Sequence, residues 1–305
     1  MTVWHRGANA KAGSTPRMRA MKSPFLRLPL ALVFLIPVMV VQALTPRWTR
    51  PFVGRPSDAV LGALVGCVLG WVAYRAYVKL IERRRGIEFG AQGALRELGC
   101  GLVIGAALFA ATIGVLAALG LYTVQGWRDP AVLIAPLAVS AGAAVIEELL
   151  FRGVIFRIIE ASLGTWIALV ISAALFGLVH LGNPNASWLA AAAISLEAGI
   201  MLAAAYVLTR RLWLPIGIHA AWNFTQGGLF SVAVSGGKTD GLLVASLNGP
   251  SWLTGGEFGA EASVVAMLWC TALGVWLLVL AARRGNFVLP FWKRAVTGPT
   301  AMPSP

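Results

Sequence analysis

The stretch AVLIAPLAVSAGAAVIEELLFRG, residues 131–153, joins an uncharged apolar run to two adjacent carboxylates and an arginine. Residues 131–146 carry no charge, and the apolar segment that they begin is typical of a helix that crosses a membrane. Ionisable side chains at membrane depth are costly and are therefore candidates for function. We predict a membrane-spanning helix that carries part of a chemical site at Glu147, Glu148 and Arg152.

The rest of the chain has the composition of a membrane protein. Of its 305 residues, 58% are hydrophobic and only 12% are charged, whereas about a quarter of the residues in soluble domains are charged. We therefore predict an all-α polytopic membrane protein, a bundle of about eight transmembrane helices. The predicted spans are residues 29–45, 58–79, 98–123, 131–151, 166–181, 188–208, 213–232 and 262–282.

One helical bundle is expected to fill the chain between two polar tails. Residues 1–28 are basic and rich in small residues, which predicts a disordered cytoplasmic tail. The transmembrane bundle is expected over 29–285, with the chemical motifs in 131–230, followed by a flexible tail over 286–305. The glycine-rich segment 234–259 is interpreted as a long loop outside the cytoplasm.

The formal net charge of +13 is explained by membrane topology. Lysines and arginines gather in the N-terminal tail and after alternate predicted spans, which is the pattern of the positive-inside rule. We therefore expect an integral protein of the cell membrane with both termini in the cytoplasm. A basic excess of this kind also attracts anionic lipid head groups, so the lipid bilayer, and not nucleic acid, is the expected partner.

The spacing of the polar residues indicates which of them can meet. Glu148 and Arg152 are four residues apart, so they share a helix face and can form an ion pair. Glu147 points about 100° away from Glu148 and is free to face another group. His219 and Asn223, on a later predicted span, also share a helix face.

His180 ends the predicted span that follows the one carrying Glu147. If these two spans form an antiparallel hairpin around residues 161–165, Glu147 and His180 lie at nearly the same height, roughly 25 Å from the turn. We therefore predict that the two residues belong to one site. The depth of this site in the bilayer is left open by the sequence.

A carboxylate, two histidines and an asparagine suit the hydrolysis of an amide by an activated water. In a metal-free scheme, Glu147 is the general base for a water held by His180 and His219, and Asn223 stabilises the oxyanion. Alternatively, Glu147, His180 and His219 hold one divalent metal such as zinc and leave a position for water. The HExxH pattern of one-helix zinc proteases is absent from the chain, and the sequence does not decide between the two schemes.

Other polar groups in the spans have no assigned role in this scheme. Glu197 is a mid-span carboxylate that either lines the cavity or pairs with a basic side chain such as Arg75. The cysteines, Cys67, Cys100 and Cys270, lie in or beside separate spans and are interpreted as packing residues.

Three short motifs in this order resemble the CPBP family of intramembrane metalloproteases, which includes the CAAX prenyl endopeptidases and the bacterial Abi proteins. EELLFRG (147–153) fits EExxxR, FGLVH (176–180) fits FxxxH, and HAAWN (219–223) fits HxxxN. The resemblance covers about residues 131–230 and implies an eight-helix bundle. The catalytic centre that it implies consists of Glu147, His180, His219 and Asn223, with Glu148 and Arg152 completing the first motif.

We accordingly expect an intramembrane endopeptidase that acts on a peptide or protein substrate at the membrane. CAAX processing is what the resemblance implies, and the sequence itself names no substrate. A non-proteolytic membrane protein that binds its target, for example in bacteriocin immunity, is one alternative. An ion-coupled transporter is another, because buried glutamates and histidines also serve ion pathways.

Overall fold

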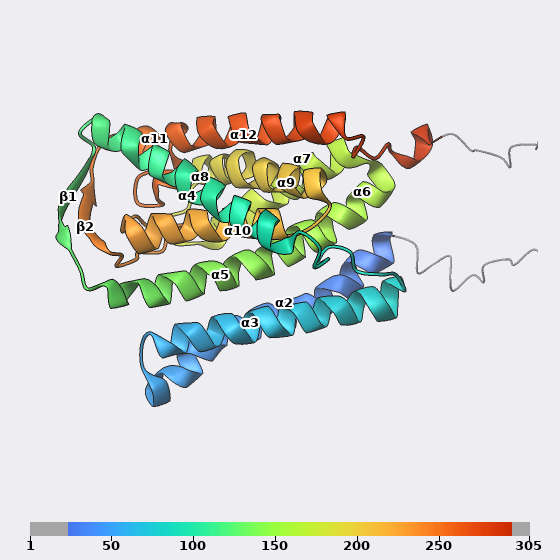
Figure 1. Ribbon diagram of the computed structural model, residues 1–305, viewed down its shortest axis with the longest axis horizontal. Coiled ribbons are helices and arrows are strands. Elements are labelled where there is room, and N and C mark those ends of the chain that lie inside the picture. Colours follow the sequence, from blue (N-terminus) through green and yellow to red (C-terminus); the bar gives the residue numbers. More distant parts are fainter. Residues whose placement is uncertain (1–23, 295–305) are drawn as a thin grey trace, which may run out of the picture.

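The apolar runs fold into long helices that lie along a common direction, and the computed structural model describes residues 24–294 of the chain. Figure 1 shows these helices with a small sheet at one end of the bundle and both ends of the described chain at the other. Within residues 24–294, seven helices are long and apolar enough to cross a membrane. The prediction of an all-α polytopic membrane fold is therefore confirmed.

Several of these long helices contain a π-helical or 3-10 segment, labelled η. The membrane-length helices are α2 (Pro24–Val53), α3 (Ser57–Tyr77) with η1 (Val78–Glu82), α4 (Ala94–Ala118), η2 (Pro130–Leu133) with α5 (Ile134–Glu148), η3 (Leu149–Phe156) and α6 (Arg157–Leu163), α7 (Thr165–Val179) with η4 (His180–Gly182), α8 (Trp188–Ile194) with η5 (Ser195–Ile200) and α9 (Met201–Thr209), and α12 (Val264–Arg283).

The seventh predicted span, residues 213–232, is shorter than expected. It forms α10 (Trp213–Asn223) and η6 (Phe224–Leu229), which are 11 and 6 residues long. Most side chains of α10 are buried, and the helix packs against α4, α5 and α9 in the interior of the bundle. A helix that is surrounded by other helices does not have to cross the whole hydrocarbon layer, because its backbone ends are buried in protein and are not exposed to lipid.

A two-stranded antiparallel sheet departs from the purely helical expectation. Strand β1 (Tyr122–Trp127) pairs with β2 (Leu243–Leu247), which lies in the segment predicted to be a loop. Helix α4 ends before the predicted boundary at residue 123 because Gly120 adopts a φ of 74°, and the Tyr-Thr-Val sequence that follows favours a strand. The remaining short elements are α11 (Ser251–Thr254), η7 (Ala260–Ala262) and η8 (Phe291–Lys293).

The hairpin that carries the first two motifs has the predicted form. The helix that starts at Pro130 continues without interruption past Arg157 to Leu163. Gly164 then makes the turn with a φ of 84°, a conformation that glycine adopts without the steric cost of a side chain. Glu147 lies near the middle of this helix, about 25 Å from either end at ~1.5 Å per residue. The candidate site is therefore deep within the bundle.

Two parts of the predicted tails are ordered by contacts with the bundle. Residues 24–28 form the first turns of α2 and not the end of a disordered tail. The side-chain amide of Asn286 donates to the carbonyls of Val207 and Leu208, at 3.0 and 2.9 Å, and so ties the segment after α12 to α9. The rest of the predicted tails, residues 1–23 and 295–305, lies outside the described residues.

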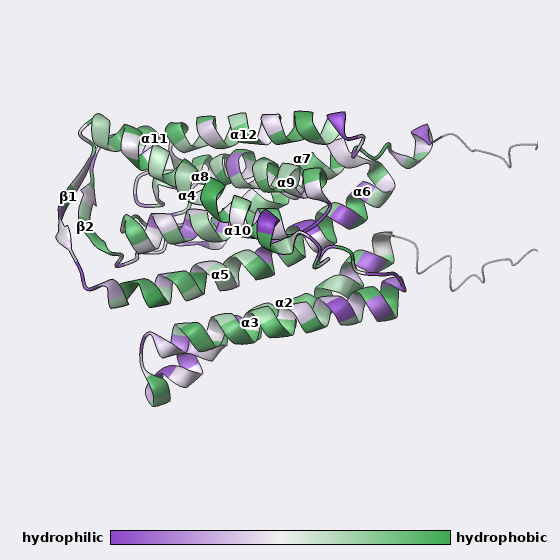
Figure 2. Ribbon diagram, in the orientation of Figure 1, coloured by the Kyte–Doolittle hydropathy of each residue, from purple (hydrophilic) through white to green (hydrophobic). Residues whose placement is uncertain are grey.

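Charged residues gather at the end of the bundle that holds both ends of the described chain, as the hydropathy colours of Figure 2 show. At this end Glu82 pairs with Arg27, Arg84 and Arg157, at 3.2, 2.7 and 2.8 Å. The middle of the bundle is mostly apolar, so the few polar groups placed there stand out.

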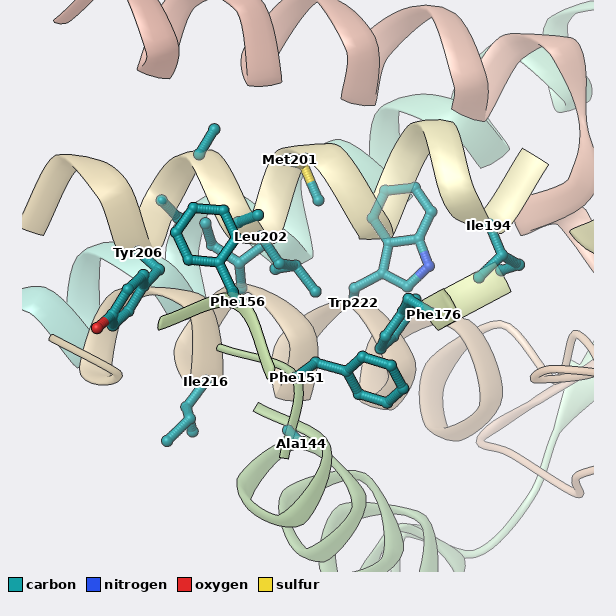
Figure 3. Close-up of a cluster of buried hydrophobic side chains, with 14 of the residues drawn as sticks. Ala144, Phe151, Phe156, Phe176, Ile194, Met201, Leu202, Tyr206, Ile216 and Trp222 are labelled. Carbon is teal, nitrogen blue, oxygen red and sulfur yellow. The ribbon is translucent and has the colours of Figure 1, made fainter. Parts of the chain in front are cut away.

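The interior beside the motifs is filled by aromatic and aliphatic side chains (Figure 3). Phe151 of η3 and Phe176 of α7 make an edge-to-face contact with ring centroids 4.8 Å apart, and Phe156 contacts Tyr206 of α9 in the same way at 5.7 Å. Trp222 of α10 lies in the same cluster. These contacts fix the helices that carry the candidate residues, because a close-packed core does not deform continuously.

Candidate functional site

Helix α10, which carries His219 and Asn223, is held against α4 by glycines. A Cβ atom added to Gly101 would lie 2.5 Å from the carbonyl oxygen of Leu214, and one added to Gly217 would lie 2.5 Å from that of Leu98. A Cβ atom on Gly105 would overlap the carbonyl of Ile218, the residue before His219. Small residues at this seam let the two backbones approach closely, as in other membrane helix pairs.

Glu148, Arg152 and His219 form a fully buried polar network. Oε1 of Glu148 accepts from the guanidinium of Arg152 at 2.7 Å, so the ion pair predicted from their spacing is present. The same oxygen accepts from Nδ1 of His219 at 3.0 Å. The Glu148 and Arg152 side chains are each 0% exposed. Since a buried charge needs both a partner and hydrogen bonds, the network fixes the ring orientation of His219.

The π-helical turns around this network supply further acceptors for Arg152. Its second terminal nitrogen donates to the carbonyls of Ala198 and Gly199, in η5, at 2.8 and 3.2 Å. Gly199 also lets η5 lie close to α7, because a Cβ atom there would lie 2.8 Å from the Cα atom of Ala173. Single π-helical turns often occur at functional sites, and here they lie directly after Glu148, at Glu197 and directly after Asn223.

Glu147 faces the other nitrogen of His219. Its Oε2 atom lies 3.8 Å from Nε2 of His219, is itself buried, and makes no hydrogen bond within the described residues. The distance is too long for a direct hydrogen bond, but one water molecule can bond to both atoms. Glu147 and Glu148 therefore face the two nitrogens of one imidazole ring from opposite sides.

His180 lies at the end of α7 and its ring is held by Phe176. Nδ1 of His180 is 2.6 Å from the carbonyl oxygen of Phe176, which can only accept, so Nδ1 carries the proton and Nε2 is left as an acceptor. The Phe176 ring contacts both imidazoles, with centroids 4.9 Å from that of His180 and 6.3 Å from that of His219. Phe176 also faces the guanidinium of Arg152 at 4.6 Å.

The two histidines and Asn223 line a common cavity of about 30 Å³. A space of this size holds one or two water molecules, since about 10–15 Å³ is needed for each. Glu147 does not line this cavity, but its Oε2 atom lies 3.8 Å from Nε2 of His219, which does. On its other side, Glu147 closes a cleft of about 320 Å³ between α2, α3 and α5. The predicted residues therefore meet around His219, between a water-sized cavity and a larger cleft.

Two further carboxyl groups, Glu197 and Glu261, line the same small cavity. Glu197 is 2% exposed and does not pair with Arg75, because the Arg75 guanidinium lies over the Trp71 ring, 4.9 Å from its centroid. The expected Glu197–Arg75 pair is therefore wrong, and the alternative expectation, that Glu197 lines the cavity, agrees with the structure. Cys270, interpreted as a packing residue, is buried in the wall of this cavity.

Glu261 is a candidate that the sequence interpretation missed. It precedes α12, is 2% exposed, and accepts from the backbone N–H of Ser235 at 2.5 Å. Burial raises the pKa of Glu261 to about 7, although this hydrogen bond partly offsets the effect. The one feature of the sequence that could have indicated Glu261 is its position directly before an apolar span. Nothing in the sequence indicates that residues 231–263 fold back onto His219.

The donor arrangement does not fit the predicted metal site. Within residues 24–294, no group of three or more His, Cys, Asp or Glu side chains is arranged to hold a metal ion. Glu147 and His219 bring two potential ligands together, but no third side chain of these types is grouped with them in the described part of the chain. The expected set of Glu147, His180 and His219 is therefore not assembled as a zinc site, and we derive no step that requires a metal.

The comparison with known families agrees with the motifs. A family model described as type II CAAX prenyl endopeptidase, Rce1-like, matches residues 129–225. Over these residues the chain is similar to the Rce1-like family, which supports its assignment to the CAAX proteases. The match covers about a third of the chain and includes every candidate residue from Glu147 to Asn223. No curated protein and no solved structure matches the chain.

The match to the Rce1-like family identifies the chain as a membrane peptidase of the CAAX prenyl endopeptidase type. Together with the seven membrane-length helices, it makes the chain an integral membrane protein. The recognition of a CAAX protease from three spaced motifs is thus confirmed.

Proposed function

We propose that this Rce1-like chain hydrolyses a peptide bond with a water molecule activated by Glu147. The observation that carries the proposal is the buried, unpartnered Oε2 atom of Glu147, 3.8 Å from Nε2 of His219. A carboxylate oxygen and an imidazole lone pair at this separation can each accept one proton of a bound water. Such a water is oriented with its oxygen lone pair free to attack a carbonyl carbon.

The proposed step requires no group from outside the chain other than water and substrate. Glu147 takes a proton from the water as its oxygen bonds to the carbonyl carbon, and the neutral carboxyl then gives that proton to the leaving amine. Glu148 and Arg152 act as positioning residues, because they hold Nδ1 of His219 as a donor and turn Nε2 towards the water. His180 presents Nε2 as a second acceptor at the cavity.

Asn223 is the proposed donor to the oxyanion. It lies one helical turn after His219 and lines the same cavity, and its amide N–H is a donor at every pH. A fixed donor at the developing negative charge lowers the barrier, and removing one such donor from other hydrolases costs about 10²–10³ in rate.

The proposed substrate is a prenylated CAAX peptide that reaches the site from the membrane. The family description supports this class, and the cleft between α2, α3 and α5 that ends at Glu147 supports access from the lipid. We further propose that the basic end of the bundle, where both ends of the described chain lie, faces the cytoplasm of the cell, as the positive-inside rule predicts.

The decisive experiment compares Glu147→Gln with Glu257→Gln in purified full-length protein. Both changes remove one carboxylate, but Glu257 is exposed on a loop and outside the site. With a prenylated CAAX peptide as the substrate, we expect Glu147→Gln to lower kcat by about 10²–10⁴ and Glu257→Gln to leave it unchanged. Cleavage by Glu147→Gln at the wild-type rate would refute the role of Glu147. The same peptide without its prenyl group tests the substrate class separately.

A further inference from the structure

A second cavity is lined by residues of the segment 74–89. This segment starts at the end of α3 that lies at the same end of the bundle as both ends of the described chain (Figure 1). It has a volume of about 460 Å³ and shares no lining residue with the cavity at His180 and His219. We call it the basic pocket, because four cationic side chains line it beside two aromatic ones. These residues are Arg75, Lys79, Arg84, Arg85, Tyr74 and Phe89.

Arg84 is held rigidly in the wall of the basic pocket. Its Nε atom donates to Glu82 at 2.7 Å, and one terminal nitrogen lies 2.8 Å from Oε1 of Glu88. The other terminal nitrogen donates to the hydroxyl of Tyr74 at 3.3 Å. Glu82 and Glu88 are also in ion-pair contact with Arg157, at 2.8 and 3.7 Å. The two carboxylates beside the pocket are therefore already shared among arginines.

The other three cations of the pocket have no carboxylate partner. Among the ion pairs of residues 24–294, none involves Arg75, Lys79 or Arg85. Arg75 instead lies over the ring of Trp71. A concave site with three unpaired cations attracts an anion, and guanidinium and ammonium groups together match the several oxygens of a phosphate.

The exposed face of α3 beside the pocket indicates which kind of molecule would bear such a phosphate. Leu64, Val68, Trp71 and Arg75 recur at helical spacing and share one face of α3. The first three are 57%, 58% and 44% exposed, so this face is an apolar stripe open to its surroundings. Tryptophan is enriched at the level of lipid head groups, and Trp71 lies one turn before Arg75. Acyl chains along the stripe would bring a lipid phosphate to the pocket.

We propose that the basic pocket binds a phosphate group, carried by the head group of an anionic membrane phospholipid. Clusters of basic residues directly after a membrane helix attract such head groups, and each lysine or arginine near the membrane surface contributes about 1 kcal/mol, or roughly fivefold in affinity. Phosphate binding here involves none of the residues proposed for hydrolysis, so it stands or falls independently of them.

The test measures binding of phosphatidylglycerol, phosphatidylcholine and inorganic phosphate to the full-length protein in a neutral detergent, by native mass spectrometry with lipid titration. The pocket variant is Lys79→Gln/Arg85→Gln. The matched control is Arg283→Gln/Arg284→Gln, which removes two exposed cations at the end of α12, at the same end of the bundle and outside the pocket. A third variant, Lys79→Arg/Arg85→Lys, keeps both charges.

We expect phosphatidylglycerol to bind more tightly than phosphatidylcholine, and the pocket variant to lose about thirtyfold in affinity for it, roughly fivefold for each side chain. The control and the charge-keeping variant should retain most of the wild-type affinity. Binding of inorganic phosphate alone, lost in the pocket variant, would support the phosphate site and assign it to a soluble anion. Equal losses of affinity in the pocket variant and the control would overturn the proposal. So would equal binding of phosphatidylglycerol and phosphatidylcholine together with no binding of inorganic phosphate.

Discussion

Nδ1 of His219 lies 3.0 Å from Oε1 of Glu148, although the two residues are 71 positions apart in the chain. The same carboxylate oxygen accepts from Arg152, so one buried oxygen joins the first motif to the third. This contact leaves Nε2 of His219 facing Glu147 at 3.8 Å. The adjacent glutamates of EELLFRG thus differ in position, because they face opposite nitrogens of the same ring.

Breaking the buried ion pair should destabilise the whole protein. Arg152→Met leaves the carboxylate of Glu148 buried without its guanidinium, and removing one partner of such a pair costs about 3–5 kcal/mol. Thermal unfolding in detergent should therefore show a clearly lower midpoint. Asp240→Asn, which breaks the solvent-exposed contact with Arg128, is the control and should cost less than about 1 kcal/mol. Equal effects of the two changes would contradict the importance of the buried network.

The glycine seam between α4 and α10 should be sensitive to a single methyl group. In Gly105→Ala the new Cβ atom would overlap the carbonyl of Ile218, which should cost about 1–3 kcal/mol and displace His219. Gly114→Ala on the same helix has nothing within 4 Å of the new atom, so it should be neutral or slightly stabilising. Unfolding midpoints and peptidase rates of both variants check this, and an active, fully stable Gly105→Ala protein would refute the close approach.

Glu261 should make stability fall as the pH rises. Burial raises the pKa of this carboxyl from 4.5 to about 7, so the folded state binds its proton more tightly than the unfolded state does. The resulting stabilisation is fully present below about pH 4.5 and is lost as the pH passes 7, with a total of up to about 3 kcal/mol. Unfolding midpoints measured from pH 5 to pH 8, roughly the range in which the group titrates, should fall for the wild type and fall less for Glu261→Gln. Identical profiles of unfolding midpoint against pH for the two proteins would show that Glu261 does not titrate in this range. Glu257→Gln, a change at an exposed carboxyl, is the control and should keep the wild-type profile.

Removal of Asn223 should lower the rate without unfolding the protein. Asn223→Ala takes away the proposed oxyanion donor, and we expect kcat to fall by about 10²–10³ with a smaller change in KM. Asn248→Ala removes an exposed amide outside the cavity and is the matched control. A change confined to KM would place Asn223 in substrate binding and not at the oxyanion.

Chelation should not abolish cleavage. The described residues gather no set of three ligands at Glu147, His180 and His219, so we expect the same rate before and after treatment with a divalent-metal chelator. Metal content of the purified protein, measured on the same sample, completes the test. Loss of activity on chelation and its recovery on addition of zinc would favour the metal scheme.

Much of the fold and the identity of the candidate site residues could be predicted from the sequence. Apolar runs of membrane length indicate spans whatever their neighbours, and the EExxxR, FxxxH and HxxxN spacings bring polar groups onto single helix faces. The turn at Gly164 and the ion pair between Glu148 and Arg152 are local features, separated by few residues, so spacing alone predicts them.

Contacts between distant segments could not be predicted in this way. Glu261 lies in a glycine-rich segment whose return to the cavity depends on the pairing of β2 with β1 and on the start of α12. Arg75 and Glu197 are both charged residues of predicted spans, but their helix faces point to lipid and to the interior respectively, which hydropathy does not distinguish. The choice between the zinc scheme and the metal-free scheme was open in the sequence for the same reason, since three suitable residues do not specify where their atoms point.

The sequence by itself determined that this chain is a helical membrane protein and which residues carry the motifs that resemble those of CAAX peptidases, because span length and helical spacing are local properties. Only the tertiary structure decided that Glu148 orients His219, that Glu147 is left unpartnered beside Nε2, and that α10 lies inside the bundle. These outcomes depend on glycine-mediated approach and burial between segments far apart in the chain, which no local pattern records.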